Sequence, residues 1–282
     1  MGPASPAKDR PKRTAAHYNR SLHRFVVLAA VFGLVRTITD GRTIAFAVAF
    51  SLLSVIMTVW LWVASQRRET KILGVIALGG SILAGVLGLL PYSAPRWLAM
   101  FEDCLAPIVF GLLVALAVLT SDSWHRGPQP VLDAGWPSLG SLSITAAALI
   151  FLDSLFGSAF RHQLLGPVLH IAGAMAGAVV VAMLCIFILT QHSAHKSLRQ
   201  SALALLVVTS VQVFLGIAEY MLRLWSAGSA ATSGSAVPLG AIHSAVGALT
   251  LAAGVALAIQ VSRHVRKPAV LPLSSPHSLG TV

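Results

Sequence analysis

The stretch GSAFRHQLLGPVLHIAGAMAGA, from Gly157 to Ala178, decides how the chain is read. It places Arg161, His162 and His170 at the start of an otherwise apolar segment. A further histidine, His243 in AIHSAVGA, lies in another apolar segment. Ionisable side chains are costly in the hydrocarbon of a bilayer, and they usually face the interior of a helix bundle, where they mark functional sites. We therefore interpret His170 and His243 as the centre of a candidate site.

The composition indicates a membrane protein. Of the 282 residues, 56% are hydrophobic and only 10% are charged, and the mean hydropathy is +0.81. These values lie outside the range of soluble globular domains. We predict an all-α polytopic membrane protein in which eight transmembrane helices form two pseudo-symmetric four-helix bundles. The predicted spans are Leu22 to Ile38, Thr43 to Ser65, Ile72 to Leu90, Trp97 to Thr120, Leu139 to Phe160, Pro167 to Thr190, Ala202 to Leu222 and Val237 to Val261.

Similar segments recur in the two halves of the chain. LGVIALGGSILAGVLGLL, from Leu73, parallels LALLVVTSVQVFLGI, from Leu203, and VFGLVR, from Val31, echoes LFGSAFR, from Leu155. The repeat aligns Glu102 with His243. Because each half has an even number of helices, the halves share one orientation and an axis along the membrane normal. The predicted parts are a disordered basic tail (1–21), an N-terminal half (22–120), a linker (121–138), a C-terminal half (139–262) and a second tail (263–282).

The distribution of basic residues predicts the topology. With the N-terminus in the cytoplasm, most of the 20 Lys and Arg residues fall in cytoplasmic segments, so both termini are cytoplasmic and the protein lies in the plasma (inner) membrane. The basic residues on the outer side are then Arg36, Arg42, Arg96, Arg161 and Arg223. No soluble domain carries the net charge of +11, which argues against nucleic-acid binding. The two cysteines lie within spans and form no CxxC metal motif.

The two histidines lie at matching depth. His170 follows Pro167 by three residues and His243 follows Pro238 by five, and each proline begins a span. In an up-down-up-down bundle these spans stand at opposite corners, so the imidazoles can reach one metal ion between them. A single membrane histidine is more often a hydrogen-bonding group. The matched pair, followed by small residues such as Gly173 and Gly247, favours bis-histidine ligation of a b-type haem.

Several segments resemble the heme A synthase family, which assembles cytochrome oxidase. NRSLHRFVVLAA, from Asn19, resembles the entry to that family's first helix. LFGSAFRH, from Leu155, resembles its fifth-helix motif, and FEDCLAPIVFGLLVALAV, from Phe101, is similar to its fourth helix. The resemblance implies an eight-helix protein with haem b on His170 and His243, and with Arg161 and His162 beside the cofactor.

The N-terminal half has carboxylates where the family has histidines or a glutamate. Glu102 stands in place of the fourth-helix histidine, and Asp40 stands where the second helix should begin with Glu-x-x-His. We interpret Glu102 and Asp40 as candidate catalytic residues, with Glu102 a proton acceptor or weak oxygen ligand.

The resemblance implies an oxidoreductase that converts the methyl group of haem O to a formyl group. Its implied partners are the lipid bilayer, haem O, an electron donor and a haem O synthase. An alternative is a non-catalytic b-type haem protein, an electron carrier or assembly factor with a degenerate N-terminal site. A transporter-like protein without cofactor is the third possibility.

Overall fold

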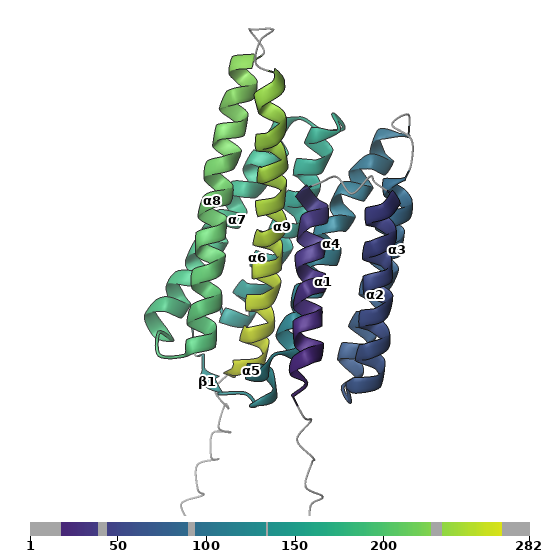
Figure 1. Cartoon of the computed structure of the whole chain (residues 1–282). Coiled ribbons are helices and arrows are strands. Elements are labelled where there is room, and N and C mark those ends of the chain that lie inside the picture. Colours follow the sequence, from purple (N-terminus) through teal and green to yellow (C-terminus); the bar gives the residue numbers. More distant parts are fainter. Residues whose placement is uncertain (1–17, 39–43, 90–93, 134, 227–232, 267–282) are drawn as a thin grey trace, which may run out of the picture.

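The computed structural model describes residues 18–38, 44–89, 94–133, 135–226 and 233–266. Long helices make up most of these residues, with one short helix and two short strands near one end of the bundle (Figure 1). The elements are α1 (Arg20–Ile38), α2 (Ile44–Ala64), α3 (Arg68–Gly88), α4 (Arg96–Thr120), α5 (Asp122–His125), β1 (Val131–Leu132), α6 (Leu139–Arg161), α7 (Pro167–Gln191), α8 (Lys196–Ser226), α9 (Ser233–His264) and β2 (Val265–Arg266).

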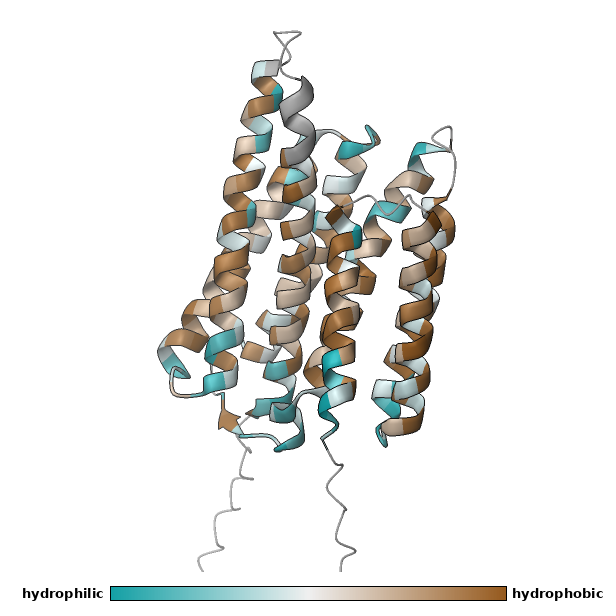
Figure 2. Ribbon diagram, viewed as in Figure 1, coloured by the Kyte–Doolittle hydropathy of each residue, from teal (hydrophilic) through white to brown (hydrophobic). Residues whose placement is uncertain are grey.

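The long helices confirm the predicted class of an all-α polytopic membrane protein. Within the described residues, eight helices are long and apolar enough to cross a membrane. The α2 helix, for example, contains no charged residue over its whole length. Apolar residues dominate the middle of the bundle, and hydrophilic residues gather towards its ends (Figure 2). Backbone groups in hydrocarbon have no water to bond, so long apolar segments form helices that satisfy those groups internally.

Several helices are longer than the apolar segments that predicted them. The predicted span Ala202 to Leu222 is part of α8, and Val237 to Val261 is part of α9. The third helix begins at Arg68, not at Ile72. Basic side chains can keep their charge in water while their stems lie along apolar surface, so charged turns extend a helix past the hydrocarbon. The sequence boundaries were too short for this reason.

The helices pack as two similar rings of four. In the first ring α1 packs on α2 and α4, and α3 packs on the same two helices. In the second ring α7 and α9 flank α6 and α8 in the same manner, so α7 and α9 stand at opposite corners. The rings meet where α4 packs on α9, and this contact is supported by α1 against α9 and α4 against α6. The pseudo-symmetric arrangement of two four-helix bundles is thus as predicted.

The linker is more ordered than its Pro- and Gly-rich sequence suggests. It contains α5 and β1, and β1 pairs in parallel with β2, which directly follows α9. His264 Nδ1 accepts a hydrogen bond of 2.9 Å from the Gln129 backbone nitrogen, and His195 Nε2 lies 3.1 Å from the Gln129 carbonyl oxygen. The first residues of the predicted C-terminal tail are therefore fixed to the linker. We call this end of the bundle the linker end, and the end with Arg161 and Pro167 the histidine end.

The two bundles are packed differently along their depth. Buried side chains of the first bundle continue from the linker end to the histidine end, where Phe50, Ala84 and Arg36 are all buried. The core of the second bundle lies towards the linker end, as Leu184, Leu198 and Leu257 show. Figure 1 shows the linker end, where α1 begins and α9 ends. The space between the second bundle's helices is thus less filled at the histidine end.

Replacement of Gly80 by Ala tests the close contact between α3 and α4. A Cβ atom at Gly80 would lie 2.7 Å from Cγ2 of Val109, which is 2% exposed and has little room to move. Overpacking costs about 1–3 kcal/mol, which exceeds the gain of about 1 kcal/mol in helix propensity. We expect Gly80→Ala to lower the apparent Tm in detergent. Gly79→Ala is the matched control, since no atom lies within 4 Å of its Cβ; an equal Tm for the two variants would contradict this packing.

Candidate functional site

Polar side chains from all four helices of the second bundle converge near the histidine end. They are Asp153 on α6, His170 on α7, Gln212 and Glu219 on α8, and His243 on α9. The ring centroids of His170 and His243 lie 6.2 Å apart, with the ring planes at 74°. The structure therefore brings together the two histidines that the sequence paired.

A carboxylate holds the first of these imidazoles. His170 Nδ1 donates to Asp153 Oδ1 at 2.9 Å, across the contact between α6 and α7. A carboxylate on one ring nitrogen fixes the tautomer and the ring orientation, and it makes the other nitrogen a better ligand. Nε2 of His170 is then the nitrogen left to bind a partner. The side chains of His170 and Asp153 remain 23% and 19% exposed, so this pair is reachable despite its depth.

The second imidazole lies among polar atoms that lack partners. His243 Nε2 is 3.4 Å from Gln212 Nε2, which is a long contact. His243 Nδ1, Gln212 Oε1 and Thr209 Oγ1 are buried and have no hydrogen-bond partner within the described part of the chain. A buried polar atom without a partner costs about 1–3 kcal/mol. Two of these atoms, Nδ1 of the imidazole and Oε1 of the neighbouring Gln212, belong to one pair of side chains, which indicates a place where a polar group or a metal ion belongs.

Glycines make room for the imidazoles. A Cβ at Gly157 of α6 would lie 3.0 Å from His170 Cε1, and one at Gly216 of α8 would lie 3.1 Å from His243 Cε1. Each histidine thus packs against the backbone of the preceding helix. A Cβ at Gly173 would lie 2.9 Å from Asp153 Oδ1, and one at Gly247 would lie 3.0 Å from Gln212 Nε2. These two glycines accommodate the polar neighbours of the rings.

The helices α7 and α8 are loosely packed around this cluster. No residue of α7 before Gly177 is buried, and none of α8 between Leu205 and Trp225 is buried. These segments include the parts of α7 and α8 that lie at the histidine end. A fully packed helix of a bundle buries one face, so α7 and α8 are less tightly packed here than at the linker end. Gln212 and Thr209 of α8 nevertheless each keep a buried side-chain atom.

Arg161 and His162 lie at the same end but contact the first bundle. His162 Nε2 is 2.8 Å from Asp103 Oδ2 of α4, and the same oxygen is 3.3 Å from Arg161 Nη1. Arg161 also donates to the hydroxyl of Ser244, next to His243. These residues were predicted to adjoin a cofactor. In the structure Arg161 contacts the residue that follows His243, and both Arg161 and His162 join α6 to α4 of the first bundle.

The position equivalent to His243 in the first bundle holds an ion pair. Arg36, with 3% of its side chain exposed, lies 3.7 Å from Glu102 Oε1 and donates to the Ala84 carbonyl oxygen at 2.5 Å. Among the described residues, Arg36 pairs with Glu102 and Arg161 pairs with Asp103, because α1 and α6 both pack on α4. Arg42 and Asp40 lie outside the described residues.

Apolar side chains fill the middle of the first bundle. A Cβ at Gly33, whose counterpart in the repeat is Gly157, would meet Leu113, Phe110 and Phe50 instead of an imidazole. Phe50 and Leu113 are 1% and 0% exposed. The same helix topology therefore encloses a dry core in one half and a polar cluster in the other.

The Asp153 and Gln212 contacts were not found from the sequence. Asp153 lies in the span that precedes the α6–α7 turn and His170 lies in the span that follows it, so packing of these two helices can bring the side chains together. Gln212 is an uncharged polar residue in an apolar span, which was the available signal. No group of three or more His, Cys, Asp and Glu side chains that could hold a metal ion occurs among the residues described.

Comparison of the chain with known proteins gives no relative: no family model matches it, and no curated protein matches it. The site must therefore be interpreted from its own geometry.

Proposed function

We propose that this chain is a membrane haem protein that holds one b-type haem between His170 and His243 and transfers single electrons. The observation that supports the proposal most directly is the 6.2 Å separation of the two ring centroids. Two imidazoles that share one metal ion at bond lengths of about 2 Å have ring centres roughly 6 Å apart. Two protein ligands suffice here because a porphyrin supplies the other four.

Two features around the imidazoles favour a bound ligand. The residues of α7 and α8 at this level are half-buried or exposed, and the partnerless Nδ1 of His243 lies in the same region. When bound, the haem would supply reversible one-electron chemistry. The protein's own contribution is to hold the imidazoles in place: Asp153 orients His170, and Gly157 and Gly216 allow the helices to approach each ring.

A second candidate is the haem O oxidation that the family resemblance implies. It requires a substrate site in the first bundle, where Glu102 and Arg36 are the polar groups at the position equivalent to His243. In its favour, Glu102 is 14% exposed at the side chain, so a carboxylate is accessible there. Against it, Phe50, Phe110 and Leu113 fill the core between the same helices. We therefore place the electron-transfer function first.

We further propose that the protein lies in the plasma membrane with its linker end and both termini in the cytoplasm. Lys196, Arg199 and Arg263 lie at the linker end, while Arg161 is at the histidine end. This distribution follows the rule that cytoplasmic ends are richer in Lys and Arg. The proposed haem is then near the outer face, where it would exchange electrons with a partner on that side.

Substitution of the proposed ligands tests the haem site. We expect purified protein to contain one low-spin, six-coordinate b-type haem, and His170→Ala or His243→Ala to abolish that spectrum because one axial bond is lost. His125→Ala is the control, since His125 lies on α5 at the linker end. Visible spectra and haem content per chain are the measurements. If both single variants keep an unchanged spectrum, the ligand assignment is wrong.

Chromatography of the extracted haems separates the two candidate functions. Haem b alone, in protein from cells that make haem O, supports the electron carrier. Conversion of added haem O to a formyl product supports the oxidase. Protein that never contains haem contradicts both and leaves the transporter-like alternative.

Replacement of Asp153 by Asn tests its role as the positioning residue of His170. The amide keeps the size of the side chain but removes the negative charge from the hydrogen bond at Nδ1. The ligand becomes less basic, so the oxidised haem is less stabilised and its reduction potential should rise by on the order of tens of millivolts. Glu219→Gln is the control: it removes a carboxylate that pairs with Arg223 and has no hydrogen bond to either imidazole in the described structure. Equal shifts in both variants would contradict the positioning role.

Labelling of introduced cysteines tests the orientation. The native Cys104 and Cys185 are buried, so they give little background. We expect an impermeant thiol reagent applied to intact cells to label Leu164→Cys, in the exposed turn between α6 and α7, but not Ser193→Cys, between α7 and α8. The reverse pattern would overturn the proposed topology.

A further inference from the structure

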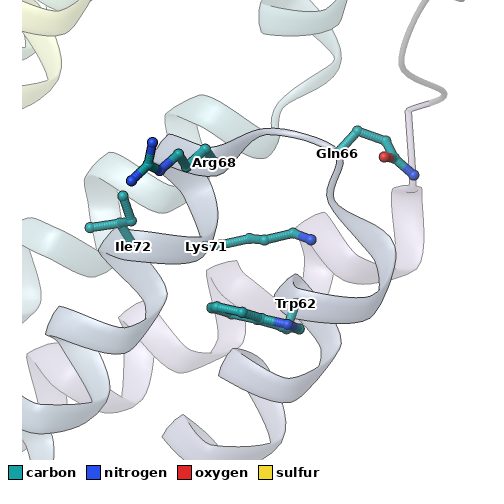
Figure 3. A pocket seen from close by; sticks show the side chains of 5 residues that line it. All are labelled: Trp62, Gln66, Arg68, Lys71 and Ile72. Atoms are coloured by element: carbon teal, nitrogen blue, oxygen red, sulfur yellow. The ribbon is translucent and has the colours of Figure 1, made fainter.

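A pocket of about 430 Å³ lies at the linker end of α2 and α3, far from the histidine cluster. It is lined by Trp62, Gln66, Arg68, Lys71 and Ile72. The Lys71 side chain stretches across the face of the Trp62 indole (Figure 3), with its Nζ atom 5.4 Å from the ring centroid. The connection between α2 and α3 thus forms a small open pocket, and the Trp62 indole forms one of its walls.

The chemistry of the lining selects an anion with an apolar part. Arg68 and Lys71 supply two positive charges and several N–H donors, and Gln66 adds an amide; the five lining residues include no carboxylate. Arg and Lys are the side chains that most often bind phosphate oxygens. Trp62 and Ile72 provide an apolar wall beside these donors. A small inorganic anion has no apolar part to contact such a wall, so the lining favours an anion that carries one.

The position of the pocket selects a lipid. Trp62 is 56% exposed and Ile72 is 46% exposed, on helices whose neighbours are all in the first bundle. Their outer sides therefore face the bilayer. Tryptophan and basic residues are typical of the level of the lipid headgroups, where an indole lies between hydrocarbon and water. Basic clusters directly beside a transmembrane helix attract anionic lipids.

We propose that this pocket binds the headgroup of an anionic phospholipid. Lys71 and Gln66 bind the phosphate, Arg68 approaches the headgroup from the opposite side (Figure 3), and Trp62 and Ile72 lie along the glycerol and the first carbons of an acyl chain. The site is independent of the proposed haem and lies in the bundle that lacks the histidine pair.

Native mass spectrometry of the delipidated full-length protein in detergent tests the site. We expect phosphatidylglycerol to bind, and phosphatidylcholine of the same acyl chains to bind more weakly because its choline cation is repelled by Arg68 and Lys71. The double variant Arg68→Gln/Lys71→Gln should lose affinity for phosphatidylglycerol by on the order of tenfold. The conservative variant Arg68→Lys/Lys71→Arg keeps the charge and should retain binding.

The matched control is Lys196→Gln/Arg199→Gln. It removes two charges with the same spacing from the same end of the bundle, at the start of α8 and away from the residues that line the pocket. Equal losses in the two double variants would show attraction to total charge alone and overturn the site. Inorganic phosphate at millimolar concentration should not displace phosphatidylglycerol. Displacement by phosphate would mean a free-anion site and would overturn the lipid assignment.

Discussion

A polar side chain in hydrocarbon needs a partner, and this constraint governs both bundles. In the first bundle the buried Arg36 pairs with Glu102 and donates to the Ala84 carbonyl oxygen. The second bundle meets the constraint only in part. Asp153 satisfies one nitrogen of His170, but Nδ1 of His243 is buried without a partner in the described structure. A ligand that bonded to the unpaired atoms of the second bundle would therefore stabilise the folded chain in the membrane.

The contact between α4 and α9 places the Arg36–Glu102 ion pair of the first bundle beside the polar cluster of the second. Both helices are the fourth of their bundle, and they pack on each other and on the first helix of the opposite bundle. A change in the spacing of the histidine pair would therefore press α9 against the first bundle. The filled core of that bundle would resist such a movement, because close-packed interiors tolerate little change in volume.

The sequence predicted the features that follow from hydropathy and repeat. The eight spans, the two bundles and the depth of His170 and His243 all depend on the positions of apolar segments and prolines, which are local. What it could not predict depends on packing between helices. The pairing of Arg36 with Glu102 requires knowing that α1 lies against α4, and the role of Gly157 requires knowing which face of α6 meets the imidazole. The pairing of β1 with β2 joins residues far apart in sequence, and short strands have no clear pattern of their own.

Glu102 and Asp103 show how one helix serves both bundles. Successive residues of an α-helix differ by about 100° in direction, so two adjacent carboxylates cannot face the same neighbour. Glu102 accordingly reaches Arg36 of α1, while Asp103 reaches Arg161 and His162 of α6. Arg161 in turn contacts Ser244, the residue after His243. The ion pair that closes the first bundle and the imidazole proposed to bind haem in the second are therefore linked through adjacent residues on α4 and on α9. The two halves thus share one helix arrangement and this link, while their interiors differ.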